Sequence, residues 1–304
     1  MATPEQPAGP AVVREAPGGS TMQAIILDGF GGLDALTYAE VPKPLPRHGE
    51  VVIRVKGFGI NHAEMHMRRG EWAEAAEISG IECVGIVDSC PGGEFPVGAK
   101  VAALMGGLGR TINGSYAQFT RVRVGNVALI ESDLSWDRLA ALPETYATAW
   151  TSLFRNLNLT AGQTIVIRGA TSSFGQAAVK LAVEAGARVI ATTRSRERFG
   201  LLESLGAARA EREVPDLGSR IAEAKRIDAV LDELSSRRQR RTDQPKLGIQ
   251  CSRYRSHSRG REVDVGVEQH GLCVGVVLLQ RRCRQRLVVA GNLTRMSAVT
   301  LSTP

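Results

Sequence analysis

The sequence lacks any long hydrophobic run. No stretch approaches the roughly 18 consecutive apolar residues of a membrane-spanning helix, so we expect no membrane span. The N-terminal segment has no apolar signal core and carries two acidic residues beside its single arginine, which argues against a secretory signal or a transit peptide. We interpret residues 1–21, rich in Pro and Gly, as a disordered leader or as sequence upstream of the true start.

Cysteine is scarce, and none occurs between Cys90 and Cys251. The chain has five cysteines, an odd number, with no secretory signal. This pattern indicates reduced thiols and a cytoplasmic protein. The cysteines and histidines near the C-terminus also lack the spacing of a zinc finger.

Excess positive charge is absent from most of the chain. The net charge is +7, but residues 233–304 carry +9, which leaves −2 for residues 1–232. An arginine-rich tail could contact nucleic-acid phosphates, and such binding would be steeply salt-sensitive. Tyr254 is the only aromatic residue of that tail and no recognition motif is present, so we do not expect a nucleic-acid partner.

Short β-like runs separated by Gly- and Pro-rich turns fill residues 22–145, as is typical of a compact β-rich domain. The sequence predicts strands at 23–27, 50–59, 82–87, 100–104 and 116–124. It also predicts helices at 61–69, 136–142 and 144–157.

From residue 146 to residue 232, strands alternate with helices, which predicts an α/β fold with a doubly wound parallel sheet. The expected strands are 164–168, 188–192 and 227–231, and the expected helices are 174–185, 195–205 and 216–225. A further strand before the last helix is a weaker expectation. The pattern stops near Glu233, so we expect the sheet to be incomplete at its C-terminal end.

The turn between the first of these strands and its helix predicts a phosphate site. A pyrophosphate needs free backbone N–H groups, and the positive end of a helix supplies them. The glycine positions of G-x-G-x-x-G hold Ala170, Ser172 and Gly175, a weak match that its place in a βαβ unit strengthens. The expected binding residues are consecutive: Gly169, Ala170, Thr171, Ser172, Ser173, Phe174 and Gly175.

The second strand of this unit ends without an acidic residue. A site for NAD usually places an acid there to bind the ribose hydroxyls. This chain has threonines instead, with Arg196 and Arg198 following. A solvated helix start is the alternative, but arginine in a first helical turn opposes the helix dipole. We therefore predict NADPH as the cofactor.

Four segments in this order resemble the medium-chain dehydrogenase/reductase superfamily, in its zinc-free quinone oxidoreductase branch. They are 59–64 (GINHAE), 80–85 (GIECVG), 142–150 (LPETYATAW) and 169–175 (GATSSFG). The resemblance covers residues 22–232. It implies a GroES-like domain at 22–145 and a Rossmann NADP-binding domain at 146–232, with the cofactor in the cleft between them.

The resemblance also implies roles for residues outside the turn. Asn61 and Thr148 would approach the nicotinamide, and Thr193, Arg194 and Arg198 would lie near the adenosine phosphate. The implied reaction is hydride transfer to a quinone or an α,β-unsaturated carbonyl, with solvent or a weak donor supplying the proton. No catalytic residue is identified; the candidate proton donors, Tyr146, His62 and His66, also fit structural roles. The same resemblance leaves the oligomeric state open, with a homodimer as the candidate, because dimers of the family often form through the region that differs here.

The ligands of a catalytic zinc are missing from the sequence. By resemblance, a zinc-dependent member would have Cys where Asn61 stands and His where Ile81 stands. His62 and His66 are spaced to share one helix face, but no third ligand is evident. We therefore predict no metal.

Residues 233–304 do not resemble the family. Their abrupt, arginine-rich and aromatic-poor composition suggests a frameshift, an unspliced intron or an annotation error near Glu233. A missing sheet edge would leave the strand at 227–231 unpaired and prone to aggregation. The alternative to an active reductase is thus a truncated, catalytically impaired homologue with weak or no cofactor binding.

Overall fold

The computed structural model describes residues 19–72, 74–215, 217–221, 226–232, 250–253, 286–288 and 298–300. The chain divides into two compact units, with the boundary between Glu144 and Thr145. Most of the expected leader and most of the arginine-rich tail lie outside the described residues. The frameshift hypothesis concerns that tail, so it too falls outside the described residues.

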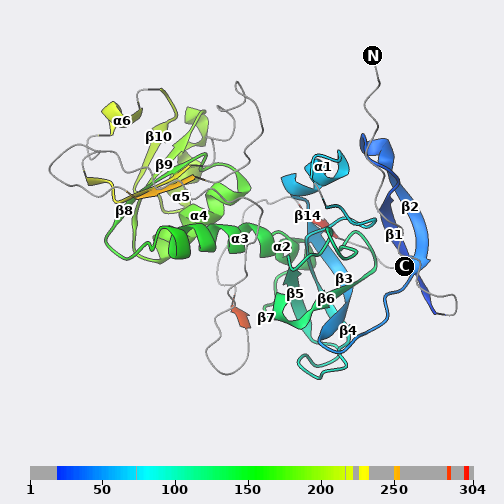
Figure 1. Ribbon diagram of the computed structural model, residues 1–304. Coiled ribbons are helices and arrows are strands. Elements are labelled where there is room, and N and C mark those ends of the chain that lie inside the picture. The colour runs from blue at the N-terminus through cyan, green and yellow to red at the C-terminus, as the bar shows by residue number, and fades with distance from the viewer. Residues whose placement is uncertain are drawn as a thin grey trace, which may run out of the picture. The chain divides into compact units, whose positions relative to one another are not determined.

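The first unit is built on antiparallel β-structure. A two-stranded sheet joins β1 and β2, and a second sheet has the order β13-β7-β5-β4-β3-β14, with β6 also paired to β3 (Figure 1). The strands are β1 (Thr21–Leu27), β2 (Leu36–Pro42), β3 (Glu50–Gly59), β4 (Glu82–Ser89), β5 (Lys100–Leu104), β6 (Phe119–Arg123), β7 (Val127–Glu131), β13 (Arg286–Val288) and β14 (Ala298–Thr300).

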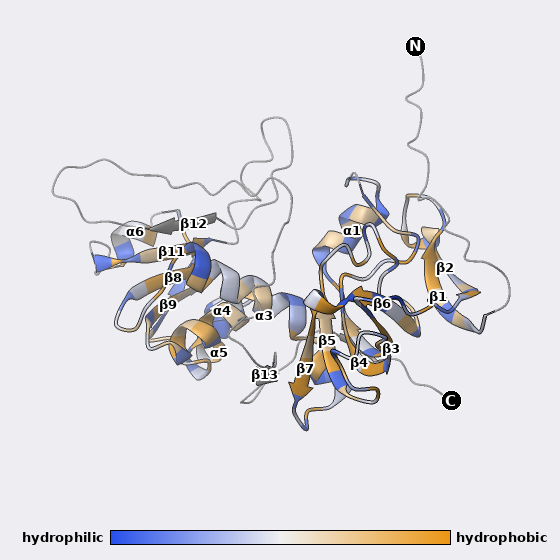
Figure 2. Ribbon diagram, turned by 60° about the horizontal axis from the view of Figure 1, so that its bottom comes forward, coloured by the Kyte–Doolittle hydropathy of each residue, from blue (hydrophilic) through white to orange (hydrophobic). Residues whose placement is uncertain are grey.

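Apolar side chains from these strands form one core. Ile53, Val101 and Val127 come from β3, β5 and β7 and are fully buried in it, with Ile78 and Leu108 from the connecting loops. Figure 2 shows β1 and β7 largely in the hydrophobic colour. The apolar residues of β1 and β3 to β7 therefore supply the core that holds this unit together.

Three short helices accompany this unit: α1 (His62–Arg68), α2 (Trp136–Ala140) and the first residues of α3 (Pro143–Trp150). Pro143 occupies the first helical position, where its missing N–H is not needed. The chain continues from α3 into a π-helical stretch, Thr151–Asn156, where the sequence predicted one uniform helix. None of the helices in the described part of the chain is long and apolar enough to cross a membrane.

The second unit has a five-stranded sheet of order β10-β9-β8-β11-β12. Its strands are β8 (Thr164–Arg168), β9 (Arg188–Thr193), β10 (Arg209–Arg212), β11 (Ala229–Asp232) and β12 (Gln250–Arg253), and its helices are α4 (Ser173–Glu184), α5 (Phe199–Ser204) and α6 (Leu217–Arg220). The first four strands are parallel. This confirms the expected mixed fold, a β-rich unit followed by a parallel α/β sheet.

The outer edge of β11 differs from the prediction. We expected that strand to be unpaired, but β12 forms an antiparallel ladder with it, from Ala229 opposite Arg253 to Asp232 opposite Gln250. The ladder satisfies backbone N–H and C=O groups that an open edge would expose. The run of parallel strands nevertheless ends at β11 in the described residues.

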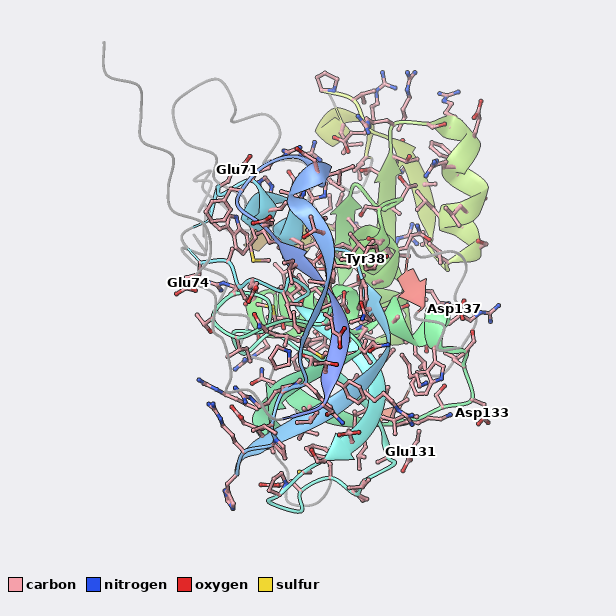
Figure 3. The ribbon with its side chains drawn as sticks, turned by 90° about the vertical axis from the view of Figure 1, so that its right-hand side faces the viewer. Tyr38, Glu71, Glu74, Glu131, Asp133 and Asp137 are labelled. Atoms are coloured by element: carbon pink, nitrogen blue, oxygen red, sulfur yellow. The ribbon has the colours of Figure 1, made fainter. Side chains whose placement is uncertain are left out.

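Strands β2, β7 and β14 of the first unit were not predicted. In β2 most side chains are exposed, and Tyr38 on this strand is 84% exposed (Figure 3). A strand with so little burial lacks the alternation of apolar and polar residues on which the prediction depends. Its pairing with β1 along all seven residues fixes it instead.

Candidate functional site

The turn between β8 and α4 has the geometry expected of a phosphate-binding loop. It follows the carboxyl end of a parallel strand, and Gly169 begins it with a φ of +71°, which favours glycine. The backbone N–H of Ala170 donates to the carbonyl of Thr192 on β9 at 3.0 Å, which anchors the turn to the neighbouring strand. Ser172 closes the turn by donating its N–H to the Gly169 carbonyl at 3.0 Å.

Gly175 lets α4 approach the end of β8. A Cβ at this position would lie 2.5 Å from the Gly169 carbonyl oxygen and 2.6 Å from the Ala170 Cα, so only glycine fits. Ser172 caps the helix, and its Oγ accepts a hydrogen bond from the Gly175 N–H at 2.8 Å. The strand, the turn and the helix therefore form one tightly packed junction.

The predicted residues of this turn divide into two groups. Ala170 is fully buried and its N–H is already bonded, so it serves packing. Ser173 is exposed and Phe174 is partly buried, and as residues of the first helical turn they have no intrahelical acceptor for their N–H groups. Thr171 is partly buried beside them. This arrangement fits the pyrophosphate of a dinucleotide, which binds to free amides at a helix start.

Cationic side chains gather just beyond the end of β9. Arg194, Arg196 and Arg198 are exposed, and none forms an ion pair with another described residue. Thr193 is buried, and its Oγ1 accepts a hydrogen bond from the Ser195 N–H at 3.3 Å. The guanidinium groups are therefore available to an anion, while the threonine shapes the turn that carries them.

An acidic residue lies next to this strand end, and sequence reasoning missed it. Glu213 follows β10, and its N–H donates to the Thr193 carbonyl at 2.8 Å. Its carboxylate accepts a hydrogen bond from Thr192 Oγ1 at 2.6 Å and forms an ion pair with Arg168, which also pairs with Asp232. The parallel pairing of β10 with β9 brings Glu213 here, and no motif in the sequence signals it.

In the first unit, Asn61 is held by a fully buried carboxyl group. It precedes α1, and its Nδ2 donates to Glu82 Oε1 at 2.8 Å. Glu82 is the first residue of β4, and its Oε2 accepts from the Glu144 N–H at the start of α3 at 2.8 Å. Glu82 thus joins Asn61 to the first turn of α3.

A second buried carboxyl group, that of Glu64, lies beside this pair. It accepts hydrogen bonds from the Asn61 N–H at 2.6 Å, the Tyr116 hydroxyl at 2.9 Å and the Ile81 N–H at 3.1 Å. Burial raises the pKa of Glu64 to about 7 and that of Glu82 to about 8, although the hydrogen bonds oppose the shift. In the sequence, the sign of a buried carboxyl group was Glu82, an acidic residue within the otherwise apolar segment GIECVG.

The remaining predicted residues are Thr148, Tyr146, His62 and His66. Thr148, on α3, is partly buried, and its carbonyl accepts from Ser152 Oγ at 2.9 Å. Burial raises the pKa of Tyr146. His66 is paired with Glu71, and the His62 and His66 rings are 6.1 Å apart. Over the residues that the structure describes, no three His, Cys, Asp or Glu side chains gather as a metal site.

Comparison with known protein families and sequences gives a consistent picture. Residues 47–132 match the alcohol dehydrogenase GroES-like domain. The chain is 34% identical over 167 residues to the mouse synaptic vesicle membrane protein VAT-1 homolog-like, covering 53% of this chain and 38% of that protein. It is 30% identical over 200 residues to mouse quinone oxidoreductase, covering 63% and 58%. The chain thus spans less than two thirds of either relative.

Solved structures show the same fold. AibC superposes with a TM-score of 0.68 at 25% identity, over 74% of this chain and 72% of that one. An NAD-dependent alcohol dehydrogenase gives 0.63 at 28% identity, over 69% and 70%. A mycobacterial protein in complex with NADPH gives 0.58 at 25% identity, over 66% and 62%. In sequence and in fold the chain is therefore similar to members of the medium-chain dehydrogenase/reductase superfamily, quinone oxidoreductases among them, and residues 47–132 match its GroES-like domain.

Proposed function

We propose that the protein is a zinc-independent oxidoreductase that uses NADPH to reduce a quinone or an α,β-unsaturated carbonyl. The observation that carries the proposal is the glycine-lined turn at the carboxyl end of β8, with three exposed arginines beyond the end of β9. The names of the relatives support an oxidoreductase, and one structural neighbour binds NADPH.

Binding of the cofactor is divided among residues of distinct kinds. Amides of the first turn of α4 hold the pyrophosphate, with the hydroxyls of Thr171 and Ser173 beside them. Arg194 and Arg198 hold the 2′-phosphate, a group that guanidinium binds with paired hydrogen bonds. Asn61 and Thr148 are the residues that we assign to binding of the nicotinamide. Bound NADPH supplies the hydride, and the protein orients it.

The buried carboxyl groups hold Asn61, the residue that we assign to the nicotinamide, in a fixed position. Because its pKa is about 8, Glu82 retains its proton at neutral pH. A neutral carboxyl group can stay buried at little electrostatic cost and still bond both Asn61 and the Glu144 N–H. The proton that completes the reduction comes from solvent or from a weak donor, for which Tyr146 is a candidate.

Zinc independence is part of the proposal. Asn61 and Ile81 stand where the resemblance has zinc ligands, and the Asn61 amide is already bonded to Glu82. The expected result is that prolonged dialysis against a chelator leaves the reductase activity unchanged. Loss of activity, restored by added zinc, would contradict this part.

The arginines give the first test of the cofactor. Changing both Arg194 and Arg198 to Met removes the charges proposed to bind the 2′-phosphate. We expect KM for NADPH to rise by about tenfold or more, since each charge-assisted contact contributes roughly 1.5–3 kcal/mol, while KM for NADH changes little. The exposed Arg155, changed to Met, is the control. Equal effects on both cofactors would rule out this role.

A second candidate function is that of a catalytically impaired homologue. Among the described residues the run of parallel strands ends at β11, which is followed by the antiparallel β12. Binding of NADPH without turnover across a panel of quinones and enones would support this second candidate. Turnover of any of them would favour the first.

The localisation, oligomeric state and partners of the protein are also proposals, based on the sequence and on its resemblance to the family. We propose a cytoplasmic homodimer that acts on a small molecule, with no membrane or nucleic-acid partner. Light scattering coupled to gel filtration tests the oligomeric state, and a single mass of 32.6 kDa would contradict the dimer.

A further inference from the structure

The Glu82 carboxyl group lies directly behind Asn61, the residue that we assign to the nicotinamide. Its Oε1 accepts a hydrogen bond from Asn61 Nδ2 and its Oε2 accepts one from the Glu144 N–H, each at 2.8 Å. Glu82 is only 2% exposed. A single hydrogen bond therefore separates this buried acid from the amide that would meet the cofactor.

A glycine at position 59 makes room for this carboxyl group. A Cβ on Gly59, the last residue of β3, would lie 2.2 Å from Glu82 Oε1 and 2.9 Å from Glu82 Cδ. The carboxyl group thus occupies the space that a side chain at residue 59 would fill. Its place beside Asn61 is set by this space and by the two N–H groups that its oxygens accept.

The titratable groups that face Glu82 come from every element packed against it. Glu64 lies on α1, Tyr116 precedes β6, Glu144 lies on α3, and Cys83 is the next residue of β4. Each of these groups is neutral or negative, so none of them compensates a negative charge on Glu82. Burial, the largest cause, and the charges of Glu144 and Glu64 raise the pKa of Glu82 to about 8.

The two oxidation states of the cofactor differ in charge at this end. The nicotinamide ring of NADP⁺ carries a positive charge, whereas the ring of NADPH is neutral. A positive charge near a buried carboxyl group favours the ionised form of that group, because the protein interior screens the attraction weakly. A neutral ring has no such effect. Ionised Glu82 should therefore favour the oxidised cofactor more than protonated Glu82 does.

We propose that Glu82 is a specificity-determining residue that makes the choice between oxidised and reduced cofactor depend on pH. The inference rests on the proposed function, because it requires the nicotinamide to bind beside Asn61. Glu82 gives up its proton to solvent when a positive ring binds, and it keeps the proton when a neutral ring binds. The affinity for NADP⁺ therefore rises as pH increases toward and past the pKa of Glu82, while the affinity for NADPH does not.

Calorimetric titration of the full chain with NADP⁺ and with NADPH tests the proposal. Between about pH 6 and pH 9 we expect the dissociation constant for NADP⁺ to fall at least about fivefold relative to that for NADPH. Both cofactors carry the same phosphates, so phosphate titration cancels in this ratio. In folded E82Q, which cannot ionise at this position, the ratio should not change with pH. E184Q, at an exposed position of α4, should behave like the unaltered chain.

Proton release on binding is a second readout, and it needs no variant. Titrations of the unaltered chain at pH 7.5, in buffers that differ in ionisation enthalpy, count the protons released. NADP⁺ should release more protons than NADPH, because only the positive ring draws the proton from Glu82. Equal release by the two cofactors would overturn the inference, as would a pH-dependent ratio that persists in folded E82Q.

The role of Glu82 and the proposed function fail in different ways. If the unaltered chain binds neither NADP⁺ nor NADPH, both are contradicted. If it binds both cofactors with a ratio of affinities that does not change with pH, only the role of Glu82 is contradicted.

Discussion

Burial of the Glu82 carboxyl group is costly for the first unit. A carboxylate removed from water loses several kcal/mol of hydration unless its charge is compensated, and no cation is among the groups bonded to Glu82. The site instead shifts the pKa of the carboxyl group to about 8. Strong shifts of this kind concentrate at functional sites, which fits the contact between Glu82 and Asn61.

The raised pKa values predict how stability depends on pH. Glu82 titrates near 4.5 when unfolded and near 8 when folded, so the folded state binds more protons between these values. The free energy of unfolding therefore falls as pH rises from about 4.5 to about 8, and Glu64 adds to the fall up to about pH 7. Thermal melts from pH 5 to 9 measure this decline.

Changing Glu82 to Gln tests which residue causes the decline. Gln does not titrate, but its NH2 group cannot accept one of the two N–H bonds that Glu82 accepts, so E82Q should be less stable than the unaltered chain near pH 5. Its stability should then stay nearly constant up to pH 9, where the unaltered chain has lost stability. E184Q, at an exposed helix position, is the control. A pH profile of E82Q that parallels that of the unaltered chain would exclude Glu82 as the source.

At the scale of elements, the junction of β8, its turn and α4 depends on close backbone contact. Gly175→Ala introduces a Cβ against backbone atoms that cannot move aside. We expect a loss of roughly 1–3 kcal/mol in stability and at least about tenfold in NADPH affinity. Gly200→Ala, in α5, has no atom within 4 Å of the new Cβ and should be neutral or slightly stabilising.

Melting temperature and NADPH titration of both variants measure these effects. The result that would contradict the account is a Gly175→Ala chain that keeps its affinity for NADPH, because the turn would then not set the approach of the helix to the phosphates.

The sequence predicted elements well where local pattern and burial agree. β3, β5 and β8 occupy the predicted residues, because each is an apolar run bounded by turn residues. β10 was only weakly expected, since its four residues RAER carry three charges and acquire their conformation by pairing with β9. The helix expected at 216–225 is described only as α6, Leu217–Arg220, and the rest of that range is mostly outside the described residues.

The candidate site was predictable only in its local parts. The turn from Gly169 to Gly175 and the three arginines are contiguous in sequence, so a motif reveals them. The partners of Arg168 lie 45 and 64 residues away, and the register of four parallel strands brings them together. Glu82 and Asn61 are 21 residues apart and meet through the start of β4. No spacing rule in the sequence specifies such contacts.

At the scale of the whole molecule, charge is distributed unevenly. Residues 1–232 have a net charge of −2, yet the end of β9 presents three exposed arginines. A local positive site on a weakly acidic background attracts an anion in a salt-dependent way. We expect the dissociation constant for NADPH to rise severalfold between about 0.05 M and 0.5 M salt, while that for NADH changes less.

The central claim is that the second unit binds the phosphates of NADPH through the turn after β8 and the arginines after β9. Calorimetry with 2′,5′-ADP and with 5′-AMP tests it most directly, because both carry the adenosine half alone and differ only in the 2′-phosphate. The account predicts that 2′,5′-ADP binds at least about tenfold more tightly, as 1.4 kcal/mol from the added charge requires. Equal affinities, or no binding of 2′,5′-ADP, would contradict it.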